Sequence, residues 1–123
     1  MRINSISYAN FKSGKVNINI PESAGMSDEY KLYLSKVAEA GDADIEIKPH
    51  RLRGFYTNRT KYYKINVSRI YNNNCFCMDN FIEVLKTAKI SEIETKIAQG
   101  ILSSLSLLTN KIAHSETDKI IKK

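Results

Sequence analysis

The chain has 123 residues, of which 42% are hydrophobic, and it carries 19 Lys and Arg against 13 Asp and Glu, a formal net charge of +6. This length predicts one domain with one core, and the hydrophobic fraction excludes a disordered chain. The longest apolar-leaning uncharged stretch, residues 99–110, is too short and too rich in Ser and Thr to cross a bilayer. Residues 1–15 lack the apolar core of a secretory signal, so we expect a cytoplasmic protein with no membrane partner, with export through other signals left open.

The first half of the chain predicts a hairpin, a helix and a further strand. Two short strands with apolar residues at 3, 6, 8 and at 16, 18, 20 are expected around a turn at residues 13–14. Ser27 is a suitable N-cap for an amphipathic helix over residues 28–40, which Gly41 would end. From Ala43 the apolar residues alternate with polar ones, which predicts a half-buried strand as far as Pro49.

A run without acidic residues extends from Ile47 to Arg69 and holds all of the excess positive charge. Without its seven cations, 12 Lys and Arg remain against 13 acids, a net charge of −1. Charge segregated in this way suggests a functional surface that faces an acidic partner, because dispersed charge would serve only solubility. Tyr63, Ile65 and Val67 alternate with polar residues, and residues 57–59 are turn-like. The run therefore predicts a β-hairpin, which we call the basic hairpin (residues 47–69).

The last part of the chain is predicted to be helical. Asp79 would cap a first helix, whose apolar residues are Phe81, Ile82, Leu85 and Ala88. Ser91 and Glu94 form a capping-box pattern for a longer helix over residues 92–113. Its apolar stripe comprises Ile93, Ile97, Ile101, Leu105, Leu108 and Ile112, widened by Leu102. The charged tail, residues 115–123, is expected to fray.

These elements predict a single α+β domain over residues 1–123. We expect a small, mostly antiparallel sheet of four or five strands, covered on one face by one central helix and two C-terminal helices. The opposite face of the sheet, or its edge hairpin, would present the basic aromatic surface.

The basic hairpin offers what a nucleic-acid surface requires, and this is the leading functional hypothesis. Arg and Lys neutralise phosphates, and aromatic rings stack on exposed bases. The predicted binding residues are Lys48, Arg51, Arg53, Phe55, Tyr56, Arg59, Lys61, Tyr62 and Lys64. The same residue types are favoured at protein interfaces, so the alternative is a bacterial or phage effector, inhibitor or adaptor that grips an acidic protein. The bacterial or phage origin is suggested by the many Ile, Lys and Asn residues, which are typical of AT-rich coding sequences.

A third hypothesis is a small ribonuclease-like toxin that needs no metal. His50 would be its general acid or base, and Glu46 or His114 would supply the second group. Glu46-Ile47-Lys48 also fits half of a metal-dependent nuclease signature, with Glu22 or Asp28 as the other acid. Neither pattern demands catalysis, and the favoured reading is a protein that is not an enzyme and uses no cofactor.

The two cysteines and the leucines of the long helix allow two further predictions. Cys75 and Cys77 are separated by one residue, so on a strand both thiols point to one side; we expect buried structural thiols and no metal site. The leucines at 102, 105, 107 and 108 cover more than one face of the long helix, which suggests a homodimer through residues 92–113.

Overall fold

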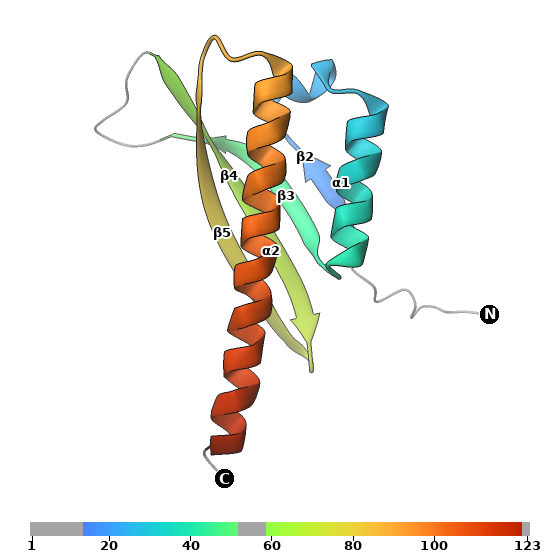
Figure 1. Ribbon diagram of the computed structural model, residues 1–123, viewed down its shortest axis with the longest axis vertical. Helices are drawn as coiled ribbons and strands as arrows, with labels where there is room; N and C mark the ends of the chain where they lie inside the picture. Colours follow the sequence, from blue (N-terminus) through green and yellow to red (C-terminus); the bar gives the residue numbers. More distant parts are fainter. Residues whose placement is uncertain (1–13, 52–58, 122–123) are drawn as a thin grey trace, which may run out of the picture.

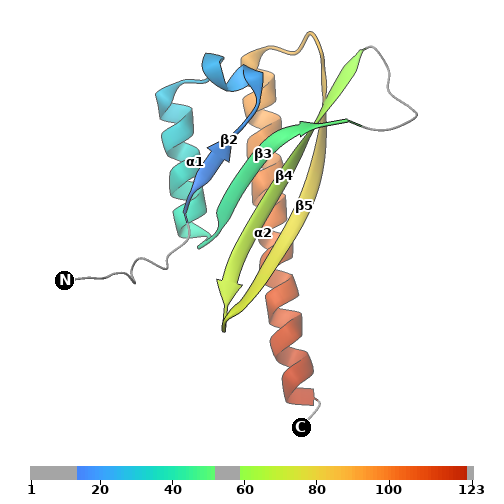
Figure 2. The same cartoon turned by 180° about the vertical axis from the view of Figure 1, so that it is seen from behind.

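The computed structural model describes residues 14–51 and 59–121 of the chain. Its elements are β2 (Val16–Ile18), the 3-10 helix η2 (Pro21–Gly25), α1 (Asp28–Ala40), β3 (Asp44–His50), β4 (Thr60–Tyr71), β5 (Asn74–Leu85) and α2 (Ile90–Ile121). The strands form one sheet in the order β2-β3-β4-β5. Both α-helices cover the same face of this sheet (Figure 1), and the other face is open (Figure 2). The expected α+β class with a four-stranded sheet is therefore confirmed for the described residues.

The sheet is mixed because its first described strand runs parallel to its neighbour. Val16 lies opposite Ile45 in a parallel pair, whereas β3–β4 and β4–β5 are antiparallel. A parallel pair requires a crossover, which η2 and α1 provide. The first strand of the predicted N-terminal hairpin falls on residues 1–13, outside the described residues.

Helix α1 begins and ends where the sequence predicts. The Ser27 side chain accepts a hydrogen bond from the Tyr30 backbone N–H at 3.1 Å, and Gly41 is the C-cap. Leu34 and Ala38 are buried against the sheet. The spacing of these residues thus directs one face of the helix into the core.

The predicted helix after Asp79 is wrong, because residues 74–85 form strand β5. Asn72 and Asn73 have φ values of 50° and 65°, a conformation that suits a two-residue hairpin turn. Beyond this turn β5 pairs with β4 along its whole length. Its helix-facing residues include the polar Asn80, whose side chain donates to the Gly100 carbonyl at 3.2 Å. Asn80 interrupts the apolar alternation that would otherwise indicate a strand.

The described residues contain one C-terminal helix, α2, where two were expected, and two α-helices in all. Its predicted apolar stripe from Ile93 to Ile112 is buried, as expected, but Leu102 is half exposed and does not widen it. The helix continues through the charged segment to Ile121 and extends past the end of the sheet (Figure 1). Fraying of its last turns stays a prediction. None of the described helices is long and apolar enough to cross a membrane.

Candidate nucleic-acid interface

The basic hairpin forms as predicted, from β3 and β4. His50 lies opposite Tyr62 and Lys48 opposite Lys64, and Tyr63, Ile65 and Val67 face the core. Three of the predicted binding residues, Arg53, Phe55 and Tyr56, lie outside the described residues. The other six are Lys48, Arg51, Arg59, Lys61, Tyr62 and Lys64.

Most of the described cations of the hairpin contact an acid or a carbonyl oxygen. Lys48 lies 3.9 Å from Glu46, Lys64 lies 3.6 Å from Asp79, and Lys61 forms an ion pair with Glu22. Arg69 donates to the carbonyls of Gly41 and Asp42 at the end of α1. Arg51 and Arg59 are exposed and form no ion pair within residues 14–51 and 59–117.

The open face of the sheet does not itself carry the excess positive charge. Alternation places Lys48 and Lys64 on this face together with four carboxylates, those of Asp44, Glu46, Asp79 and Glu83. With His50 neutral, these residues sum to a net charge of −2. Of the two expected locations for the basic surface, the open face is therefore unsuitable. The hairpin remains, but it does not lie at the edge of the sheet as expected, because β3 and β4 are the two central strands.

The unbalanced cations gather where β3 ends and β4 begins. A cavity of about 410 Å³ lies there, lined by residues that include Arg51, Lys61, Lys86 and Glu22. The three cations and one acid give the lining a net charge of +2. Arg59 adjoins it, because its carbonyl accepts a hydrogen bond from the Lys86 N–H at 2.8 Å. We call this region the hairpin end; it comprises His50, Arg51, Arg59, Lys61, Tyr62 and Lys86.

Glu22 stays ionised at the inner wall of this cavity. Burial alone would raise the pKa of Glu22, but the Lys61 ammonium, which donates a hydrogen bond to the carboxylate, and the nearby Tyr63 hydroxyl outweigh it and hold the pKa below its ordinary value. Burial, followed by the Glu22 carboxylate, raises the pKa of Tyr63. Tyr63 is 2% exposed, and its hydroxyl completes no hydrogen bond of ordinary geometry with any described residue. Lys61 is thus held in place by a charged partner, whereas Arg51 and Lys86 form no ion pair with any acid in the described part of the chain.

His50 is not brought together with either of its predicted catalytic partners. Its ring packs on Phe81, with centroids 4.6 Å apart. Glu46 is four residues away on the same strand face, a separation of about 13 Å, and His114 belongs to α2, which covers the opposite face. On the same face, the Glu83 carboxylate accepts a hydrogen bond from the hydroxyl of Tyr62, the residue opposite His50. The geometry offers His50 an aromatic contact rather than a paired acid or base.

The cysteines are exposed, so the expectation of buried thiols is wrong. Cys75 and Cys77 do point to one side, but this is the open face of β5. Among the described residues no group of three or more His, Cys, Asp or Glu side chains is placed to hold a metal ion.

On α2, Leu105 and Leu108 are buried while Leu102 and Leu107 are about half exposed. Only the last two remain available for the predicted homodimer, which stays a prediction.

The sequence analysis missed Lys86, Glu22 and Tyr63 as members of this site. Lys86 could have been found from the Asn72-Asn73 turn, because a two-residue turn there pairs residue 59 with residue 86. Glu22 and Tyr63 gave no such signal, since their approach depends on how η2 packs. Comparison with protein-family models, with curated proteins and with solved structures found no match.

Proposed function

We propose that this protein is a small, non-enzymatic binding module that engages single-stranded nucleic acid through the hairpin end. The observation that supports the proposal best is the charge around the cavity, whose lining contains the three cations Arg51, Lys61 and Lys86 and one acid, Glu22. Arg59 extends this positive region over the adjoining surface. Lysine and arginine at such a site neutralise phosphates and release counterions.

The aromatic residues favour a single strand over a duplex. Tyr62 and Tyr63 line the cavity. Tyr62 is partly exposed opposite His50, whereas Tyr63 is buried, so Tyr62 supplies the ring that a base can reach. Unpaired bases can stack on such rings, whereas the bases of a duplex are already stacked on each other. A cavity of about 410 Å³ is within the size range of small-ligand pockets. The site therefore suits a short footprint in which one nucleotide enters the cavity and its neighbours contact Arg51 and Arg59.

Fluorescence anisotropy of labelled single-stranded RNA, single-stranded DNA and duplex DNA tests this proposal. Affinity should fall as salt rises from about 50 to 200 mM. The triple variant Arg51→Ala, Arg59→Ala, Lys86→Ala should lose most of the affinity and lower the slope of log affinity against log salt by about 2, at about 0.7 per phosphate contact.

The matched control removes the same charge elsewhere. Lys15, Lys31 and Lys36 lie at β2 and α1, and their replacement by Ala should leave binding nearly unchanged. Equal loss in both triple variants would mean that binding follows net charge and not the hairpin end. No binding of any strand at low salt would reject the proposal. RNA that is cleaved after incubation, and intact with His50→Ala, would favour the ribonuclease hypothesis instead.

An acidic protein partner is the second candidate for the same surface. Phe81 is 50% exposed and its ring packs at a tilt against that of His50, which precedes the exposed Arg51; Arg and aromatic residues together are common at interaction hot spots. A pull-down from nuclease-treated lysate separates the two candidates. A protein captured by the wild type and lost with the Arg51, Arg59, Lys86 variant would favour the second.

A further inference from the structure

Strand β5 has a free edge with which no other described strand pairs. It is the last strand of the sheet and pairs only with β4. The Lys86 N–H bonds to the Arg59 carbonyl across the ladder, and antiparallel hydrogen bonding alternates from that pair. Asp79, Phe81 and Glu83 consequently direct their backbone N–H and C=O groups away from β4.

The two halves of this edge differ. In the half that follows the Asn72-Asn73 turn, the Lys111 ammonium donates to the Cys77 carbonyl at 3.3 Å, so a residue of α2 already bonds to a carbonyl that points outward. In the half that leads to Leu85, the outward backbone groups of Asp79, Phe81 and Glu83 bond to no described residue. Unpaired edges of this kind are templates for another strand.

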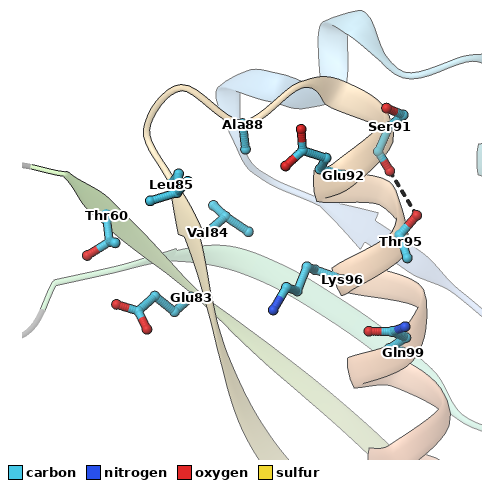
Figure 3. A pocket seen from close by; sticks show the side chains of 10 residues that line it. All are labelled: Thr60, Glu83, Val84, Leu85, Ala88, Ser91, Glu92, Thr95, Lys96 and Gln99. Atoms are coloured by element: carbon cyan, nitrogen blue, oxygen red, sulfur yellow. Dashed lines mark hydrogen bonds between the residues drawn. The ribbon is translucent and has the colours of Figure 1, made fainter.

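A cavity of about 670 Å³ lies at the Leu85 end of this edge, between β5 and α2 (Figure 3). Val84 on the helix side and Glu83 and Leu85 on the open side all line it. Because both faces of β5 contribute, the cavity lies at the edge of the strand and not on one face. Helix α2 forms the far wall with Glu92, Thr95, Lys96 and Gln99. We call the edge from Asp79 to Leu85 and this cavity together the edge groove.

We propose that the edge groove binds an extended peptide, which adds to β5 as an antiparallel strand. Main-chain hydrogen bonds would supply affinity, and alternate side chains would supply specificity. This site is separate from the hairpin end and does not depend on the function proposed there.

The side chains of β5 indicate the chemistry of that peptide. On the open face the added strand would lie beside Asp79, Phe81 and Glu83 in turn, which favours a cation, an apolar residue and a cation. Its intervening residues would lie on the helix-facing side beside Ile82 and Asn80, where α2 approaches closely at Gly100, which favours small side chains. The predicted pattern is Lys-Val-Leu-Val-Lys.

A second copy of the chain fits this edge less well. Pairing β5 with itself about a twofold axis would gather the Asp79 and Glu83 carboxylates of both copies on one face. Like charges opposite each other across strands are destabilising. Charge complementarity therefore favours a basic strand from another protein.

The test uses Lys-Val-Leu-Val-Lys, extended by Gly-Ser at both ends, and ¹⁵N-labelled protein. Chemical-shift changes should be concentrated in residues 79–85 and in the facing part of α2. N-methylation of the central Leu should weaken binding about tenfold or more, because its N–H would bond to β5. N-methylation of a flanking Val should have little effect, because that N–H points away. This pair of peptides has the same composition, so it separates strand addition from adhesion by charge.

A protein variant gives an independent check. Phe81→Pro removes an outward N–H without removing a hydrogen bond to β4, a position where edge strands tolerate proline, and it should abolish peptide binding. Phe81→Val retains the N–H and should bind. If the proline variant does not fold, the two methylated peptides still decide the matter. Equal binding of both, no binding of the parent peptide at about 1 mM, or a β5-mediated dimer in sedimentation would overturn the proposal.

Discussion

Replacing Gly100 by Ala tests the close approach of α2 to the sheet. A Cβ atom at this position would lie 2.7 Å from the Ile65 Cδ1 atom and 3.1 Å from the Ile82 Cγ2 atom. Carbon atoms in contact prefer a separation of about 3.5–4.0 Å, so either the helix or Ile65 must move by almost 1 Å. Ile65 is fully buried, and because protein cores are close-packed, turning its side chain would disturb its neighbours.

The change in the free energy of unfolding caused by Gly100→Ala is the sum of two opposing effects. Overpacking a well-packed core costs about 1–3 kcal/mol, and exchanging Gly for Ala within a helix returns about 1 kcal/mol through propensity. We expect Gly100→Ala to lower the free energy of unfolding by about 1 kcal/mol. For a chain of this size that loss lowers Tm by about 4 °C. Urea unfolding followed by circular dichroism measures it.

Ile65→Val is the matched background, because it removes the Cδ1 atom that the new methyl group would meet. On its own it should cost about 1 kcal/mol. In the Val background, Gly100→Ala should become neutral or stabilising, so the two changes should be strongly non-additive. If Gly100→Ala instead raises stability by about 1 kcal/mol in both backgrounds, as propensity alone predicts, the close packing at this point is refuted.

Two further predictions concern the ion pair at the hairpin end and the turn before β5. Lys61→Met should cost about 1–3 kcal/mol at pH 7, because it leaves the Glu22 carboxylate partly buried without its cation. Since the pKa of Glu22 is depressed in the folded protein, its contribution is present above about pH 4.5, its ordinary value, and is lost as the pH falls further. Thermal melts of the two proteins should therefore converge towards pH 3, and a constant gap would argue against the pair. Asn73→Gly should stabilise by up to about 1 kcal/mol, because Asn-Gly is preferred where both turn residues have positive φ; a loss of stability in urea unfolding would show that the Asn73 side chain is needed.

How far the sequence predicts this fold depends on whether apolar periodicity is continuous. Helix α1 and the stripe from Ile93 to Ile112 have unbroken helical spacing, and the structure confirms both. Strand β5 was mistaken for a helix because Asn80 stands at a helix-facing position, where its bond to Gly100 makes a polar residue acceptable. The spacing of Phe81 and Leu85 resembles a helix, yet both are exposed. A hydrogen bond between residues so far apart in the chain cannot be predicted from the local pattern of apolar and polar residues.

In the candidate site, too, the features set by local pattern could be predicted and those set by long-range contacts could not. The pairing of β3 with β4 follows from alternation, and the exposure of Arg51 and Arg59 follows from their charge. The ion pairs of Lys61 and Lys64 and the hydrogen bonds from Arg69 to carbonyl oxygens do not, because each partner comes from another element of the fold. Charge in a sequence therefore overstates the free charge on the surface, and the difference can be assigned only once the partners are in place.

The length of α2 has a consequence for how its amide protons exchange with solvent. The helix has 32 residues and measures about 48 Å, and the last residue of its buried stripe is Ile112. Amides near Gly100 can exchange only when the whole molecule opens, whereas those after Ile112 need only the last turns to unwind. One unbroken helix should thus show slow exchange at one end and fast exchange at the other. The point where the rate rises would mark the limit of the cooperative unit more sharply than any change in helical geometry.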